Sequence, residues 1–279
     1  MSDIGATTAA PASDIAVADH LERVHGPGEL HAVLLALLLP PGSKRALGVW
    51  RVEVGKLAGA DTLCAHATTL SGASRMPWFE VLLARMARQP LAARKKLLLA
   101  ARRLMESRGV ARPIDRLHWL TLRRGLGEAA SLATRPEVHP DDVEWLESDV
   151  QSVASFTAFL SRMVPGDVAD APQGEAWYQG VMASFPGFEV PPRQPPKAAA
   201  MVDALARLQT LSWMQRPVVI RTWVQAALAQ SRFNRLTNLS ADALRMTCAL
   251  LDSPQPPELA RHYVALAADG TARAGAAAG

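Results

Sequence analysis

The sequence predicts an all-α fold of stacked helical hairpins, and three observations support this prediction. Hydrophobic residues make up 49% of the chain and aromatic residues only 5%. Leu and Ala, which favour helices, dominate, whereas the β-branched and aromatic residues that favour strands are scarce. Apolar residues also recur at three- and four-residue steps, as on one face of a helix. Finally, Leu83 to Leu126 is repeated weakly by Leu205 to Leu251, and each copy reads as two apolar helices joined by a short polar turn, so we expect two hairpins with flanking helices.

A leader and two helices are expected first. Residues 1–27 open with MSDIGATTAAPASD, which lacks the basic stretch and long apolar run of a signal peptide, and we expect a disordered leader. A buried helix is expected from Gly28 to about Leu39, where Pro40-Pro41-Gly42 ends it. Ser43 is expected to cap the next helix, because its hydroxyl can accept a hydrogen bond from the first turn.

The third helix and the first hairpin also have predictable ends. Asp61 is expected to cap the third helix, and Gly72 is expected to end it. Pro90 and Pro113 stand where helices begin, because proline in the first helical position removes only an N–H that has no partner inside the helix. Gly109 is expected to end the helix between these two prolines.

The second half of the chain contains an acidic helix, a linker and the second hairpin. His139-Pro140-Asp141-Asp142 is typical of a helix start with acids in its first turn, and apolar residues at helical spacing continue to Met163. A shorter helix around Glu175 to Ser184 precedes a proline-rich stretch, where we expect a hinge near residue 190. The predicted organisation is a leader at 1–27, an N-terminal helical region with the first hairpin at 28–188, a linker at 189–197, the second hairpin at 198–267 and a disordered tail at 268–279.

Cysteine usage and apolar run lengths restrict the class of protein. Cys64 and Cys248 lie far apart and no other cysteine is present, which argues against a disulfide framework and a cysteine-based zinc site. We expect two buried thiols in a reducing compartment. The most apolar run, Leu30 to Leu39, is much shorter than the roughly 20 residues that cross a bilayer. No membrane span is expected, and the net charge of +4 is a weak argument for nucleic acid.

One stretch carries a family resemblance. It contains an acid at Asp242, the pair Leu244-Arg245 and the closing segment Leu251 to Pro257, with Ser253 in place of a cysteine. This pattern resembles the TerB-like helical domain of the tellurite-resistance type, most of all the version in the cytoplasmic tails of bacterial membrane metallopeptidases. Met76-Pro77-Trp78-Phe79-Glu80 in the first copy resembles the preceding half of the same tail.

The resemblance covers about residues 28 to 265 and is most specific in the last thirty or so. It implies a cytoplasmic location and partners among membrane-proximal or envelope-stress proteins. TerB-like domains can bind a divalent ion through acids near the turn between helices, but the turns at Glu106 to Gly109 and at Ser231 to Arg235 are rich in cations here. The peptidase motif His-Glu-x-x-His is absent, so the resemblance implies a free-standing version of the tail.

No catalytic or metal-ligating pattern stands out. No two histidines are three or four residues apart, which is the spacing that places two ligands on one helix face. The acids Asp141, Asp142 and Glu144 are what a helix dipole favours in a first turn, so they do not indicate acid–base catalysis. We therefore predict no enzyme and no cofactor. The seven histidines are His20, His25, His31, His66, His118, His139 and His262.

Charge is unevenly distributed along the chain. Twelve cations stand between residues 84 and 124 against two acids, and nine acids stand between residues 137 and 175 against one cation. The cations are Arg85, Arg88, Arg94, Lys95, Lys96, Arg102, Arg103, Arg108, Arg112, Arg116, Arg123 and Arg124. The acids are Glu137, Asp141, Asp142, Glu144, Glu147, Asp149, Asp167, Asp170 and Glu175.

Three explanations of this polarity compete. The two segments partly neutralise each other in the fold, or the basic face meets an acidic protein or anionic lipid headgroups, or it binds nucleic acid. Nucleic acid is the least favoured, because only Trp119 in the basic run could stack on bases. The candidate binding cations are Lys95, Lys96, Arg102 and Arg103. Trp177 and Tyr178, beside the proline-rich linker, are predicted to form an exposed aromatic pair that anchors a partner.

Together these features predict a non-enzymatic, cytoplasmic binding or scaffold module. It would mediate protein–protein contacts near the membrane, with a peripheral position at the inner membrane as the resemblance implies. The alternative is a nucleic-acid-binding or regulatory protein that uses the basic face at 84–124. The sequence indicates neither the identity of the partner nor an oligomeric state.

Overall fold

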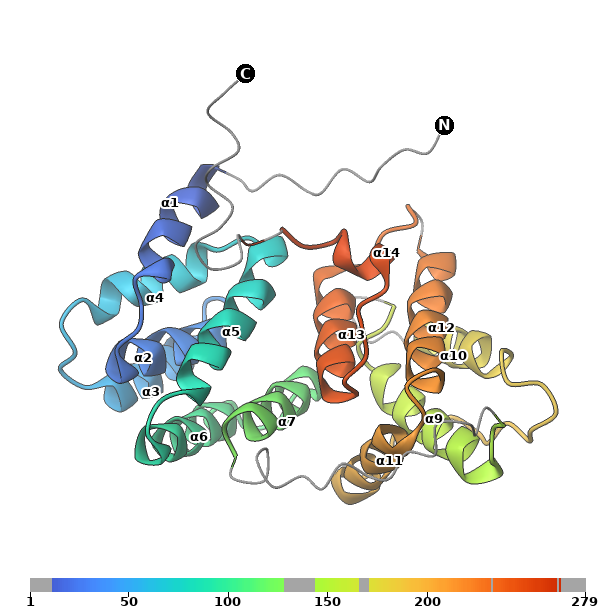
Figure 1. The fold of residues 1–279 in the computed structure, drawn as a ribbon. Coiled ribbons are helices and arrows are strands. Elements are labelled where there is room, and N and C mark those ends of the chain that lie inside the picture. Colours follow the sequence, from blue (N-terminus) through green and yellow to red (C-terminus); the bar gives the residue numbers. More distant parts are fainter. Residues whose placement is uncertain (1–11, 128–143, 166–170, 232, 265, 267–279) are drawn as a thin grey trace.

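The computed structural model describes residues 12–127, 144–165, 171–231, 233–264 and 266. Within these ranges the chain forms helices joined by turns, and no strand is present (Figure 1). The all-α prediction is therefore confirmed. None of the helices described combines the length and the apolar character that crossing a bilayer requires.

The helices of the first half pack around α2. They are α1 (Ala12–Glu22), α2 (Pro27–Leu37), α3 (Lys44–Val54), α4 (Ala60–Thr69), α5 (Gly72–Ala87), α6 (Leu91–Glu106) and α7 (Pro113–Leu126). α2 contacts α3, α4, α5 and α6, and every residue from Leu30 to Leu37 is buried. Because a helix that is apolar on all sides is stable only in an interior, α2 is the centre of this group.

The helices of the second half form another packed group. They are α9 (Glu147–Leu160), α10 (Ala171–Met182), α11 (Ala198–Thr210), α12 (Gln215–Gln230), α13 (Asn238–Leu250) and α14 (Pro257–Ala260). Trp223 of α12 ties three of them together. Its Nε1 donates to Thr157 Oγ1 of α9 at 2.8 Å, and its carbonyl accepts from Trp177 Nε1 of α10 at 3.2 Å. Both buried indole N–H groups are thus satisfied.

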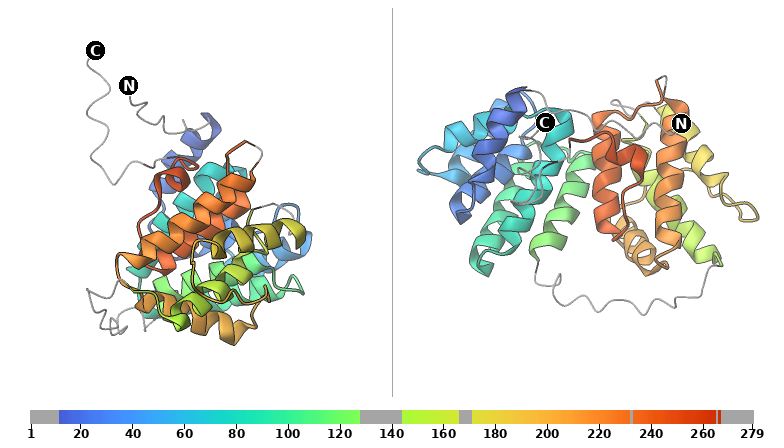
Figure 2. Two further views of the ribbon diagram at one scale, coloured as in Figure 1. Left: turned by 90° about the vertical axis from the view of Figure 1, so that its right-hand side faces the viewer. Right: turned by 45° about the horizontal axis from the view of Figure 1, so that its top comes forward.

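The two groups lie side by side, and α13 packs against α7 and α5 where they meet (Figures 1 and 2). The two segments expected to be copies correspond to α5–α6–α7 and α11–α12–α13, and the middle helices α6 and α12 both have 16 residues. The third helices of the two sets, α7 and α13, pack against each other. The duplication itself stays a prediction.

The expectation of a disordered leader is wrong for residues 12–22, which form α1. This helix contacts α4, its Leu21 is fully buried, and Val24 just after it is also buried. Asp14 accepts hydrogen bonds from both the backbone N–H and the hydroxyl of Ser71. Tertiary contacts therefore hold a segment whose own sequence is only weakly amphipathic. Residues 1–11 and the expected tail at 268–279 lie outside the described residues.

Some predicted helix ends are correct and others are shifted. Ser43 Oγ accepts from the backbone N–H of Ala46 at 3.2 Å, and Pro113 begins α7, both as predicted. Gly72 was expected to end the third helix but begins α5 instead, since α4 ends at Thr69. A Cβ on Gly72 would lie 2.3 Å from the side-chain nitrogen of Asn238, so a larger residue there would require the Asn238 side chain to move.

Other differences concern α4, α9 and the end of α6. α4 begins one residue before Asp61, which therefore lies in the first turn instead of capping it. The predicted start of the acidic helix at His139 to Asp142 lies outside the described residues, and α9 itself begins at Glu147. α9 ends at Leu160, although Met163 remains buried in the following turns. Gly109 follows the end of α6 with a φ of 83°, a conformation that favours glycine.

The proline-rich stretch is extended and is fastened to α10. Tyr178 of α10 donates its hydroxyl to the carbonyl of Pro191 at 2.7 Å, and Arg193 donates to Glu175 and Ser161. α9 and α10 of the expected N-terminal region pack against α11 and α12 of the expected second hairpin. The division at 189–197 remains a prediction from the sequence.

Replacing Trp223 by Ala should destabilise the protein by about 3–5 kcal/mol, because loss of a fully buried indole would leave a cavity and remove the donor to the Thr157 hydroxyl. Trp213 offers a matched control, since 65% of it is exposed, and Trp213→Ala should stay within about 0.5 kcal/mol. Urea unfolding followed by circular dichroism measures both. Equal losses for the two variants would contradict the packing described for α12.

Candidate binding surface

The outer face of α6 carries the cations that the sequence analysis selected. Leu97 and Leu104 face the core and are fully buried. Because a helix turns by 100° per residue, the opposite face presents a different set of side chains to solvent. We call the exposed residues Lys95, Lys96, Leu99, Arg102 and Arg103 the α6 face; Leu91, Ala92 and Glu106 are exposed on the same side of the helix.

Arg102 and Arg103 pair with acidic neighbours. Arg102 pairs with Glu106 one turn further along at 2.7 Å, and Arg103 forms a bidentate pair with Glu53 of α3 at 2.6 and 2.7 Å. The hydrogen bonds from Arg103 lower the pKa of Glu53. Such exposed pairs add little to stability, so they do not explain why the cations are gathered here.

A leucine stands in the middle of the α6 face. Leu99 is 56% exposed although it is flanked by cations on both sides, and Val52 on the neighbouring helix α3 is 79% exposed. Neither residue could be identified from the sequence, because isolated apolar residues within a helical pattern are typical of a core. Their exposure is a consequence of how α3 and α6 are rotated against α2.

The remaining cations of the basic run divide between the surface and the interior. Arg85 donates to the carbonyls of Leu21, Glu22 and Val24 at the end of α1 and just beyond it. Arg124 donates to the carbonyl of Leu250 at 2.6 Å and pairs with Asp252. The basic run therefore gives the protein several internal contacts besides the α6 face.

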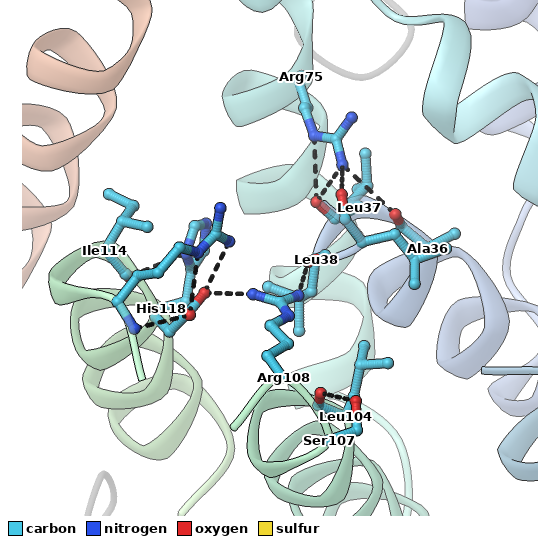
Figure 3. A network of polar contacts seen from close by, with 12 residues as sticks. Ala36, Leu37, Leu38, Arg75, Leu104, Ser107, Arg108, Ile114 and His118 are labelled. Carbon is cyan, nitrogen blue, oxygen red and sulfur yellow. Dashed lines mark hydrogen bonds and ion pairs between the residues drawn. The ribbon is translucent and has the colours of Figure 1, made fainter. Parts of the chain in front are cut away.

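The densest internal contacts surround the C-terminal end of α2 (Figure 3). Arg75 of α5 donates to the carbonyls of Ala36, Leu37 and Leu39 at distances from 2.6 to 3.4 Å. Arg108, beyond the end of α6, donates to the carbonyl of Leu38 and pairs with Asp115. The last carbonyls of a helix have no partner within it, so these guanidinium groups satisfy acceptors that would otherwise be buried without partners.

The charges of this network are balanced by Asp115. Burial opposes ionisation of its carboxyl, but hydrogen bonds from Arg112 and the charge of Arg108 keep its pKa below the usual value. Burial lowers the pKa of Arg108. Nearby, His118 Nδ1 lies 3.0 Å from the carbonyl of Ile114, and burial lowers the pKa of this histidine to about 4. His118 is therefore neutral near pH 7.

The two oppositely charged segments of the sequence do not pair with each other in the contacts described. Asp149 binds Arg207 of α11 at 2.8 Å, and Glu175 binds Arg193 at 2.8 Å. The paired cations of the basic run use Glu53, Glu106, Asp115 and Asp252. The first explanation of the polarity, mutual neutralisation, thus gains no support from the described residues, and Glu137, Asp141, Asp142, Asp167 and Asp170 lie outside them.

The expectation that Trp177 and Tyr178 are exposed is wrong. Both are buried, at 0% and 1% exposed, because the Trp177 N–H binds the Trp223 carbonyl and the Tyr178 hydroxyl binds the linker. The exposed tryptophan is Trp213, in the turn between α11 and α12. Its neighbours Met214 and Val218 are also exposed. A position between two helices, rather than inside an apolar pattern, was the only signal that distinguished it.

A buried polar cluster joins the two helical groups. Arg245 of α13 forms a bidentate pair with Glu80 of α5 at 2.9 and 2.7 Å, and its guanidinium carbon lies 4.3 Å from the ring centre of Tyr263. The Tyr263 hydroxyl donates to Asp242 at 2.9 Å. Burial raises the pKa of Asp242 to about 7, against the opposing effects of Tyr263 and the nearby cations Arg75 and Arg245. Two residues that carry the family resemblance, Asp242 and Arg245, thus belong to this joint.

The remaining chemistry of the described residues offers little to a metal or a nucleophilic reaction. Within them, no group of three or more His, Cys, Asp or Glu side chains could hold a metal ion. Cys64 and Cys248 are both free and buried, as predicted, and burial raises the pKa of Cys248 to about 12. A thiol with that pKa is a poor nucleophile at neutral pH.

Comparison with known proteins finds no matching family, no matching curated protein and no matching solved structure. The resemblance to TerB-like domains therefore stays a prediction from the residues quoted above. What the protein binds has to be argued from its own surface.

Replacing Asp242 by Asn should change how stability depends on pH. The carboxyl has a pKa of about 7 in the fold against 3.8 as its ordinary value, so the folded state retains a proton that the unfolded state releases. The contribution of Asp242 to the unfolding free energy should therefore fall as pH rises from about 4 to 7. The amide introduced by Asp242→Asn would be neutral throughout and could still accept from Tyr263, so the variant should gain stability relative to the natural protein, on the order of 4 kcal/mol across this range.

Urea unfolding at intervals between pH 4 and 8 measures this difference. Burial lowers the pKa values of His31 and His118 to about 4, so these histidines make the unfolding free energy rise with pH. Their effect is the same in the natural protein and in Asp242→Asn, so it cancels when the two proteins are compared. A stability difference that stays constant over the whole range would show that Asp242 is ionised in the fold.

Proposed function

We propose that this chain is a non-enzymatic helical binding module whose α6 face docks on the acidic surface of a partner protein. The observation that carries the proposal is the exposed Leu99 surrounded by Lys95, Lys96, Arg102 and Arg103. An apolar anchor within a charged rim is the usual composition of a protein interface. The matching partner surface would have a small apolar recess bordered by carboxylates.

The geometry of α6 supports a protein partner over a lipid bilayer. A helix that lies in a membrane interface inserts a broad apolar face. The apolar face of α6 packs in the core, where Leu97, Ala100, Ala101 and Leu104 are fully buried. On the exposed side of α6 the large apolar residues are Leu91 and Leu99, which are too few to form the broad apolar face that inserts into a bilayer. Attraction to anionic headgroups would then rest on the cations alone.

The same surface is a poor match for nucleic acid. Among the exposed residues of α6 there is no aromatic side chain on which a base could stack. A cytoplasmic location near the inner membrane is the setting that the family resemblance implies, and it forms part of this proposal.

A crosslinking experiment tests the proposal directly. A photoreactive amino acid in place of Leu99 should crosslink one acidic protein in cells that produce the full chain. The variant Lys95→Glu/Lys96→Glu should reduce that crosslink at least about tenfold, because each lost charge pair weakens the interface. The control Lys197→Glu/Arg221→Glu makes the same charge change on exposed residues of the other helical group and should leave the crosslink intact.

Two results would contradict this function. Loss of the crosslink in both double variants would show that only the net charge matters. Stronger binding of the purified chain to duplex DNA or to phosphatidylserine vesicles than to the crosslinked protein, abolished by Lys95→Glu/Lys96→Glu, would identify a different class of partner. Measuring the affinity for each ligand at several salt concentrations separates a specific contact from counterion release.

A further inference from the structure

A cavity of about 500 Å³ opens where the start of α5, the turn between α12 and α13, and α14 come together. Its volume lies within the range of small-molecule sites. The apolar part of its lining is formed by Ala73, Leu228 and Leu236. The polar part is formed by Asn234, Arg235, Asn238, Glu258, Arg261 and His262. None of these residues belongs to the α6 face.

The walls of the cavity are held in place by specific contacts. Val264 N–H donates to the carbonyl of Ala73 at 3.1 Å, which fastens the segment after α14 to the first turn of α5. His262 Nε2 lies 3.0 Å from Asn238 Oδ1. The Asn238 amide in turn lies so close to Gly72 that no larger residue fits there without a shift. The cavity is therefore built from three chain segments that are fixed to one another.

The turn that carries Arg235 is also fixed through its backbone. Ser231 Oγ accepts from the Arg235 N–H at 3.0 Å and donates to the Arg235 carbonyl at 2.7 Å. The Arg235 side chain is exposed.

The electrostatics of the cavity favour an anion. Arg235 and Arg261 carry positive charge, and Glu258 is the one carboxylate among the lining residues. Burial and the charge of Arg235 lower the pKa of His262, so the imidazole is neutral near pH 7 and can serve as a hydrogen-bonding group. α5 and α13 begin at this cavity and α12 ends there, so two helix N-termini add partial positive charge and one C-terminus adds partial negative charge.

We infer that this cavity binds a small organic anion, namely a carboxylate or phosphate group attached to a compact apolar body. Arg235 and Arg261 hold the anionic group, and the amides of Asn234 and Asn238 offer further hydrogen bonds. Ala73, Leu228 and Leu236 form the surface against which the apolar body lies. This site is independent of the partner surface on α6, so each can fail without the other.

Phenyl phosphate and benzoate are suitable probes. Benzyl alcohol is the control that lacks a charge, and inorganic phosphate is the control that lacks an apolar body. Two-dimensional NMR on the purified full chain should show both aromatic anions shifting the amide signals of residues 234–238 and 261–262. Arg235→Glu should weaken that binding by about tenfold or more, because a charge-assisted hydrogen bond is replaced by repulsion. Arg221→Glu, an exposed change on α12 outside the cavity, should leave it unchanged.

The circular dichroism spectrum and the urea midpoint establish that each variant is folded. If Arg235→Glu does not fold, Arg261→Glu is used in its place. Three results would overturn the inference: no binding of either aromatic anion at millimolar concentration, binding that survives both arginine variants, or shifts that map outside the cavity. Equal affinity for inorganic phosphate and phenyl phosphate would overturn the apolar part of the site. Equal affinity for benzyl alcohol would overturn the anionic part.

Discussion

The end of α2 is the constraint on which the rest of the structure depends. A helix buried on every side presents its last carbonyls to the interior, where an unpaired acceptor is costly. Arg75 and Arg108 satisfy the carbonyls from Ala36 to Leu39. Because these arginines belong to α5 and to the turn after α6, satisfying α2 also fixes both of those helices. The outward face of α6 and the inward face of α5 toward α13 are consequences of that arrangement.

The buried polar cluster between the two helical groups fixes the other side of α5 in the same way. Glu80 leaves α5 to pair with Arg245, and Arg245 lies over Tyr263, which binds Asp242. A buried ion pair of this kind adds little net stability, but removing one partner is strongly destabilising because it leaves the other charge buried without a counter-charge. The cluster therefore defines one relative placement of the groups. It also sets His262, the neighbour of Tyr263, at the wall of the cavity.

How much the sequence could predict depended on whether the signal was local. The all-α class, the cap at Ser43 and the start at Pro113 follow from residue types at single helix ends, and they were predicted correctly. Trp177 was wrongly predicted to be exposed, because its burial in the middle of α10 is decided by the packing of α10 against α12 and not by any local signal. Gly72 was misassigned because its role is to admit Asn238 from a distant helix. The four cations of α6 were identified, whereas Leu99 was not, because exposure depends on helix rotation.

The division between arginine and lysine explains why a count of charges overstates the basic surface. Arg75, Arg85 and Arg108 each donate to two or more oxygen acceptors inside the protein, which suits a planar group with five N–H donors. The strongly hydrated ammonium of lysine is less suited to that position, and Lys95 and Lys96 both remain outside. Part of the positive charge between residues 84 and 124, at Arg85 and Arg108, is therefore structural. What is left for a partner is a narrow face, and Leu99 at its centre makes that face selective for more than charge.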